Sequence, residues 1–147
     1  MRLAPFLSAI AGSLIVCGQA VPAPQTAEVC INKFCVTAEV VDTDETRARG
    51  LMSRSSLSEG QGMLFVFPQP GEYGFWMKNM LIPIDIVWMD KDKKVLDMRT
   101  NAQPCGKDCE SMMPSGPSLY VIELKAGFID RHNIRIGDEV FFSLSDR

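Results

Sequence analysis

The stretch "GEYGFWMKNMLIPIDIVWMD", residues 71–90, is the most informative part of this chain. Its side chains are mostly aromatic, aliphatic or methionine, which is typical of a core segment, yet Lys78, Asn79 and Asp85 lie in the middle of it. A polar group that is buried without a partner costs free energy. We therefore expect these three side chains to have partners, in either a structural or a functional role.

This stretch predicts a hairpin of two strands, 73–79 and 84–90, joined by the loop "MLIP". In that register Lys78 lies opposite Asp85, and Trp76 comes next on the same face of the sheet. Two interpretations stay open. The pair is either a structural ion pair at one end of the core, or part of a ligand pocket with the tryptophan as its floor.

The rest of the chain continues in short β-prone runs separated by turns. Further strands are predicted at 34–41, 63–67, 94–101, 118–125 and 138–144. One short helix is predicted near 43–51, with Asp42 as its N-cap and Gly50 at its end. This pattern predicts a mainly β (β-rich α+β) fold, an antiparallel β sandwich or barrel-like domain with one short helix.

The N-terminus has the features of an export signal. Residues 1–20 begin with a positive charge, continue in an apolar run too short to span a bilayer comfortably, and end in the small residues of "GQA". We predict a signal peptide over 1–20, a flexible leader over 21–28 and a single β-rich domain over 29–147. The mature protein is then periplasmic or secreted, without stable membrane insertion. Lipidation of Cys17 is a weaker alternative, because the residue before it is the bulky Val16.

Composition and charge narrow the classes of partner. The chain has 147 residues, of which 46% are hydrophobic and 22% charged, which is the composition of one globular domain. Its formal net charge is −3, without a basic stripe or a run of like charges. We therefore expect no nucleic-acid partner.

Four cysteines remain after the predicted signal peptide, and their spacing favours two local disulfides. Cys30 and Cys35 flank a two-residue loop in a predicted hairpin, where the cross-strand distance suits a bridge. Cys105 and Cys109 lie in a loop rich in Gly, Pro and Asp. Each short bridge contributes roughly 2 kcal/mol. The alternative is that the cysteines bind zinc. The tight C-x2-C pairs of zinc ribbons do not occur, so we expect no metal site.

Several segments together resemble a known family. They are "RARGLMSRSSL", "GMLFVF", "FWMKNMLIPIDIVWMD", "GPSLYVIEL" and "IRIGDEV". With them the chain resembles, over 36–142, the domain of unknown function 192 family (uncharacterised protein family 0127). The resemblance implies a compact β-rich domain, often with a signal peptide, and it implies no reaction. Two departures are visible: Thr46 stands where a glutamate is usual, and Met80 stands where a threonine is usual.

Standard catalytic motifs do not occur in the sequence. There is no G-x-S-x-G, no H-E-x-x-H and no phosphate-binding glycine loop, and the single histidine, His132, lies in a turn-rich segment. Asp85 and Glu123 could form the facing carboxylates of a glycosidase, but their spacing gives no support for this. Arginine recognises carboxylates and phosphates with its planar fork. The predicted ligand-binding residues are Arg49, Arg54, Trp76, Lys78, Asn79 and Asp85.

Three classes of function stay open. The preferred one is an exported binding domain without a cofactor, whose pocket near the Phe75–Asp85 motif takes a small polar or anionic molecule. The second is an enzyme that uses Asp85 or Lys78 for proton transfer, which requires a closed cleft and a perturbed pKa. The third is a protein-interaction module, which predicts a flat apolar patch.

Overall fold

The computed structural model describes residues 24–144. The predicted signal peptide and Cys17 lie outside these described residues. The elements, in chain order, are β1 (Thr26–Ile31), β2 (Phe34–Val41), α1 (Asp44–Arg49), β3 (Gln61–Gly71), β4 (Ile84–Met89), β5 (Val95–Ala102), β6 (Ser118–Lys125), α2 (Phe128–His132) and β7 (Val140–Phe141). The mainly β prediction is therefore confirmed. No helix within the described part of the chain is long and apolar enough to cross a membrane.

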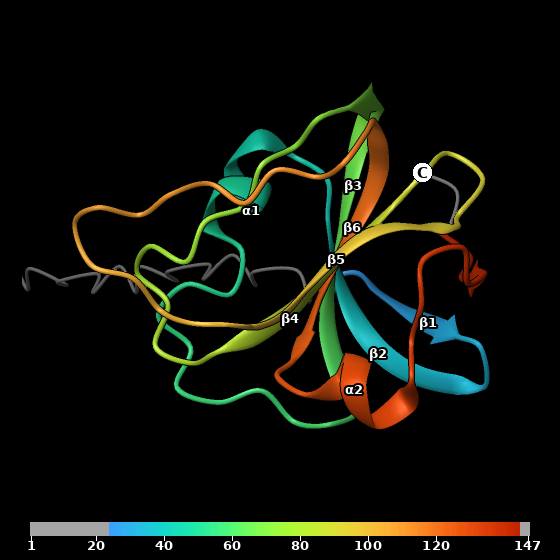
Figure 1. Ribbon diagram of the computed structural model, residues 1–147, viewed down its shortest axis with the longest axis horizontal. Helices are drawn as coiled ribbons and strands as arrows, with labels where there is room; N and C mark the ends of the chain where they lie inside the picture. The colour runs from blue at the N-terminus through green and yellow to red at the C-terminus, as the bar shows by residue number, and fades with distance from the viewer. Residues whose placement is uncertain (1–23, 145–147) are drawn as a thin grey trace, which may run out of the picture.

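The seven strands form one curled sheet in the order β5-β4-β6-β3-β2-β1-β7 (Figure 1). All neighbouring strands run antiparallel except β2 and β3, which are parallel. A parallel pair needs a crossover connection, and here the chain between β2 and β3 contains α1. The fold is thus a single mixed sheet, closer to the barrel-like prediction than to a two-sheet sandwich.

Each face of the sheet carries its own hydrophobic cluster, because side chains alternate along a strand. On β4, Val87 and Met89 join the cluster that contains α2, whereas Ile86 and Trp88 join the cluster on the other face. The second cluster also contains Leu51, which follows α1 directly. Both faces of β4 are therefore buried, and its six residues are all inaccessible.

The predicted strand at 73–79 is wrong. Phe75 and Lys78 each make one isolated bridge to the segment 105–112, and Asn79 has a positive φ of 60°. The segment lies on the face of the sheet instead of within it. Its alternating pattern comes from the apolar side chains of Phe75 and Met77, which are buried in the cluster on that face.

The N-cap of α1 is Thr43, not the predicted Asp42. The Thr43 hydroxyl accepts a hydrogen bond from the Thr46 amide at 3.2 Å, and the Thr46 hydroxyl accepts one from the Thr43 amide at 3.2 Å. This reciprocal pair is a capping box. Thr46 therefore supplies the side-chain acceptor of the capping box at the position where a glutamate is usual. The predicted end of the helix at Gly50 is confirmed, and its φ is 48°.

Other elements also differ from the sequence prediction. β1 begins at Thr26, so the last residues of the predicted leader, 26–28, pair with β2 instead of being flexible. β7 has two residues where 138–144 was predicted. A second helix, α2, has five residues and begins after Gly127, which has a positive φ of 84°.

The two cysteine pairs lie as predicted. β1 and β2 form a hairpin in which Cys30 pairs with Cys35, and Asn32 in the loop has a φ of 57°. The sulfur atoms of this pair are 2.08 Å apart, and those of Cys105 and Cys109 are 1.97 Å apart. Both distances are bonding distances for sulfur.

Candidate functional site

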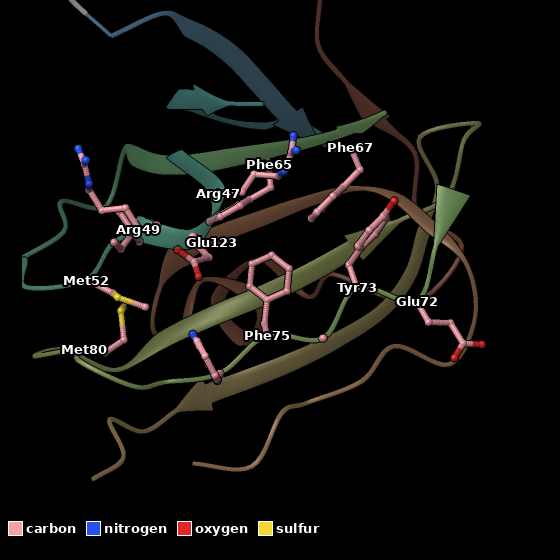
Figure 2. Close-up of a pocket in the computed structure, with 15 residues that line it drawn as sticks. Arg47, Arg49, Met52, Phe65, Phe67, Glu72, Tyr73, Phe75, Met80 and Glu123 are labelled. Atoms are coloured by element: carbon pink, nitrogen blue, oxygen red, sulfur yellow. The ribbon is translucent and has the colours of Figure 1, made fainter. Parts of the chain in front are cut away.

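A cavity of about 340 Å³ lies on one face of the sheet, between α1 and the segment 72–80. Five of the residues that line it are aromatic, namely Phe65, Phe67, Tyr73, Phe75 and Trp76. Figure 2 shows the rings of the first four, with the carboxyl group of Glu123, gathered around one space. Pockets for small molecules have volumes of about 300–1,000 Å³, so the cavity is large enough to hold one.

Ring contacts hold the aromatic wall in place. Phe65 and Phe67 are two residues apart on β3 and therefore share one face of the strand. Tyr73 stacks on Phe67, with ring centres 3.6 Å apart and planes 8° apart. Phe75 packs edge-on against Phe65 at 4.9 Å. The Tyr73 hydroxyl also donates to the Gln69 carbonyl at 2.7 Å, which ties the turn to the wall.

Glu123 on β6 supplies a buried carboxyl group to the cavity. Its strand neighbours in register are Met63 and Ile86, and only 5% of the residue is exposed. Its Oε2 atom has no hydrogen-bond partner among residues 24–144. Burial raises the pKa of Glu123 to about 8, while a hydrogen bond from the Leu51 backbone and the charge of Arg54 act to lower it. A buried acid with an unpaired oxygen calls for an explanation beyond folding.

Arg47 lines the cavity, and its guanidinium already has partners within the protein. Its guanidinium donates to the carbonyl of Asp42 and to that of Val66, the latter at 2.8 Å. It also pairs with Asp44 at 2.6 Å and lies over the Phe67 ring at 5.2 Å. Arg47 therefore connects α1 to β3 and supports the aromatic wall.

The two arginines that the sequence singled out have different environments. Arg54 forms two hydrogen bonds to Glu39, at 2.5 and 2.6 Å, which raise the pKa of Arg54 and lower that of Glu39. Arg49 is a cavity-lining residue whose side chain is 68% exposed and pairs with Glu45 at 2.8 Å. Exposed pairs of this kind are weak. In Figure 2 the Arg49 side chain points away from the rings.

Lys78 and Asp85 lie apart, so the predicted cross-strand pair is wrong. Asp85 is fully buried and accepts backbone hydrogen bonds at 2.7, 3.1 and 2.8 Å from Asn101, Gly127 and Ile129. Lys78 is exposed, with its ammonium 5.6 Å from the centre of the Trp76 ring. The pairing fails because 73–79 is not a strand. Asp85 instead holds the first turn of α2.

The other predicted residues lie at the mouth of the cavity or outside it. Trp76 lines the cavity and is 48% exposed. Asn79 is exposed and its amide lies 3.9 Å from the sulfur of Met52. Asp85 pairs with Leu124 in the sheet, so Asp85 and Glu123 point to opposite faces. They cannot act as a facing pair of carboxylates.

The sequence contains a pattern that indicates a buried position for Glu123, and the hairpin interpretation made no use of it. In "SLYVIELK", residues 118–125, the buried Val121 and Glu123 are two positions apart and share one face. A charged residue at a core-facing position of a strand is unusual. The aromatic partners on β3 gave no such signal, because phenylalanine is an ordinary core residue.

One group of potential metal ligands is present among the described residues. It consists of Glu28, Cys30 and Cys35, whose ligand atoms lie within 4.8 Å of one another. The two sulfurs are at bonding distance from each other, and a disulfide has no thiolate to offer a metal. We assign no metal to it.

The curled sheet and the cavity beside α1 define a β-rich domain with a candidate small-molecule site in its described part. Residues 27–142 match the family model of domain of unknown function 192, described as "Uncharacterized ACR", and the chain belongs to this family. A UPF0127 protein of Thermococcus sibiricus is 29% identical over 110 residues, covering 74% of this chain and 67% of that protein. A UPF0127 protein of Thermococcus gammatolerans is 28% identical over 111 residues, covering 74% and 68%.

Two solved structures have a similar fold. A candidate transcription regulator from Sinorhizobium meliloti is 26% identical with a TM-score of 0.72, covering 85% of this chain and 98% of that one. A protein of unknown function from Novosphingobium aromaticivorans is 29% identical with a TM-score of 0.69, covering 89% and 99%. The family has no established function, so a functional proposal rests on the site itself.

Proposed function

We propose that this protein is a binding domain for a small molecule, which enters the cavity beside α1 and contacts Glu123. The observation that carries the proposal is the unpaired Oε2 atom of this buried carboxyl group, which lies among aromatic rings. An unsatisfied buried polar group costs about 1–3 kcal/mol. A ligand that hydrogen-bonds to Oε2 would remove that cost, and its apolar body would pack against the rings.

Binding can be tested with a fluorescence screen of small compounds that carry one ring and one polar group. Trp76 is at the cavity mouth, whereas the other tryptophan, Trp88, is fully buried. We expect a saturable change in emission that disappears in Trp76→Phe. Ala48 is exposed and lines the cavity, so Ala48→Tyr should weaken binding at least ~10-fold by obstruction, a loss of about 1.4 kcal/mol. Ala48→Ser should bind like the original protein. A screen without any saturable response would refute the proposal.

We propose further that the protein is exported. The signal-like residues 1–20 and the two cysteine pairs at bonding distance support this. The expected product in its host is a chain that begins near Val21 and carries the bridges Cys30–Cys35 and Cys105–Cys109. Intact-mass spectrometry before and after reduction checks both points. A chain that retains Met1, or four free thiols, would contradict export.

A second candidate function is an enzyme in which Glu123 transfers a proton. The observation that favours it is the pKa of about 8 for Glu123 within a cleft. The structure leaves Asp85 and Lys78 as poorer choices, because Asp85 holds α2 and Lys78 does not line the cavity. Mass spectrometry of a bound ligand separates the two functions, since an enzyme converts its ligand and a binding domain releases it unchanged.

A further inference from the structure

We propose that the ligand of this cavity is an organic ammonium ion, a protonated primary or secondary amine on an apolar or aromatic body. This rests on the proposed binding function and names its ligand class. Three observations carry it. The buried carboxyl group has an unpaired oxygen, aromatic rings line the cavity, and the arginines that line the cavity are already paired with other groups of the protein.

The carboxyl group is the polar anchor that an ammonium ion requires. An ionised glutamate is acceptor-only, and Oε2 of Glu123 has no donor among the described residues. An N–H group of the ligand would supply that donor. The resulting charge-assisted hydrogen bond would be roughly twice as strong as a neutral one.

The walls suit a cation as well as an apolar body. Aromatic rings have a negative face and attract cations within ≈ 6 Å of the ring centre. Lys78 already occupies such a position on Trp76, at 5.6 Å and outside the cavity. The ring of Phe75 presents further aromatic surface near Glu123, and the ring of Tyr73 lines the same cavity beside Phe67 (Figure 2).

An anion would find little to pair with in the cavity. Its two cationic lining residues are Arg47, which is held by carbonyls and Asp44, and Arg49, which is exposed and paired with Glu45. Glu72 adds a negative charge at the exposed rim. The charges that face the cavity therefore favour a cation over the anion that the arginine pattern predicted.

Binding of an ammonium ion must be linked to proton release from Glu123. Facing this residue are Arg54 after α1, whose charge lowers its pKa, and Glu39 on β2, which is bonded to Arg54. β3 and β4 contribute the uncharged Met63 and Ile86 next to it. α1 contributes Arg47 and Arg49, which line the same cavity as Glu123. Arg99 on β5, paired in register with Ile86, and Glu72 at the rim are both exposed. Desolvation dominates and keeps Glu123 largely protonated at pH 7. A bound cation would favour the ionised form and expel the proton.

The test compares three probes of similar shape: benzylamine, benzyl alcohol and benzoate. We expect benzylamine to bind at least ~10-fold more tightly than either of the others at pH 8, which corresponds to about 1.4 kcal/mol. Its affinity should rise close to ~10-fold per pH unit from pH 6 to pH 7, because the amine stays protonated while Glu123 must ionise. Calorimetry in phosphate and in Tris, which differ in ionisation enthalpy, should show roughly 0.9 proton released at pH 7.

Two variants isolate the role of the carboxyl group. Glu123→Gln keeps the shape of the side chain but cannot ionise, so it should lose the preference for benzylamine and the proton release. It should still bind benzyl alcohol. Glu139→Gln makes the same change at an exposed position that does not line the cavity, and it should retain both the preference and the proton release.

The outcomes separate this inference from the proposed function. If none of the three probes binds, and the wider screen is also silent, the binding function itself fails. If benzyl alcohol or benzoate binds as well as benzylamine, or no proton is released, the ammonium inference is overturned while binding stands. A benzoate preference that disappears in Arg49→Gln would instead locate an anion site at the mouth.

Discussion

Replacing Glu123 with glutamine is expected to make the fold more stable, by about 3 kcal/mol at pH 7. Burial raises the pKa of this carboxyl group from an ordinary 4.5 to about 8. Between these two values the unfolded chain is ionised while the folded chain holds the proton, so stability falls by about 1.4 kcal/mol per pH unit. Glutamine does not titrate and avoids this loss.

The pH dependence gives the prediction its sign and its measurement. Below pH 4.5 both states are protonated and the carboxyl group adds no pH-dependent cost; above about pH 8 the cost is complete. Urea denaturation at pH 5, 7 and 8.5 should therefore show an advantage for Glu123→Gln that grows across the series. Glu72→Gln is the control, because its exposed side chain should leave the pH slope unchanged. Equal slopes for wild type and Glu123→Gln would show that Glu123 is not a raised-pKa acid.

A residue that lowers the stability of its own fold is a strong candidate for a functional group. Local rules of folding are typically broken at functional sites, where the loss is compensated elsewhere. Isoleucine or valine at position 123 would suit the hydrophobic cluster formed by Val121, Ile86 and their neighbours. The structure holds an acid there, with an oxygen that no described residue binds.

The sequence predicted the strands whose pattern reflects their own burial. Strands at 34–41 and 118–125 coincide with β2 and β6, because alternation and β-branched residues report a half-buried or buried strand directly. The same alternation at 73–79 led to a wrong strand prediction, because a loop that packs on the face of the sheet can also bury alternate side chains. Periodicity reports which side chains are buried, and not whether the backbone is paired.

The candidate site was predicted only at its mouth. Trp76 and Arg49 line the cavity, while Glu123 was considered only as a partner of Asp85 and the β3 aromatics were missed. Proximity across the sheet depends on strand order, and β3 lies beside β6 although β4 and β5 come between them in the chain. Local sequence patterns contain no information on that order. Asp85 was misassigned for the same reason, because its partners are distant backbone groups.

Replacing Asp85 with alanine is expected to destabilise the fold by about 3–5 kcal/mol. The substitution would leave three backbone N–H groups without their acceptor, those of Asn101, Gly127 and Ile129. The N–H groups of Gly127 and Ile129 lie at the start of α2, which has only five residues and no side-chain cap of its own. We therefore expect α2 and its packing on the sheet to loosen first, which hydrogen exchange of the Ile129 amide would report.

Lys78→Met is the matched control, and it decides between the hairpin interpretation and the structure. Lys78 is exposed, and among the described residues its ammonium makes one charge interaction, the cation–π contact with the Trp76 ring. Removing the ammonium should therefore change the free energy of unfolding by less than about 0.5 kcal/mol. A buried ion pair would give large losses for both variants. Urea denaturation of Asp85→Ala and Lys78→Met measures the difference, and equal losses would contradict the structure.

Because Asp85 and Glu123 lie on opposite faces, the milder Asp85→Asn variant should still release a proton on binding benzylamine, whereas Glu123→Gln should not. The two buried acids of this sheet thus have opposite effects on stability, and only the destabilising one faces the cavity.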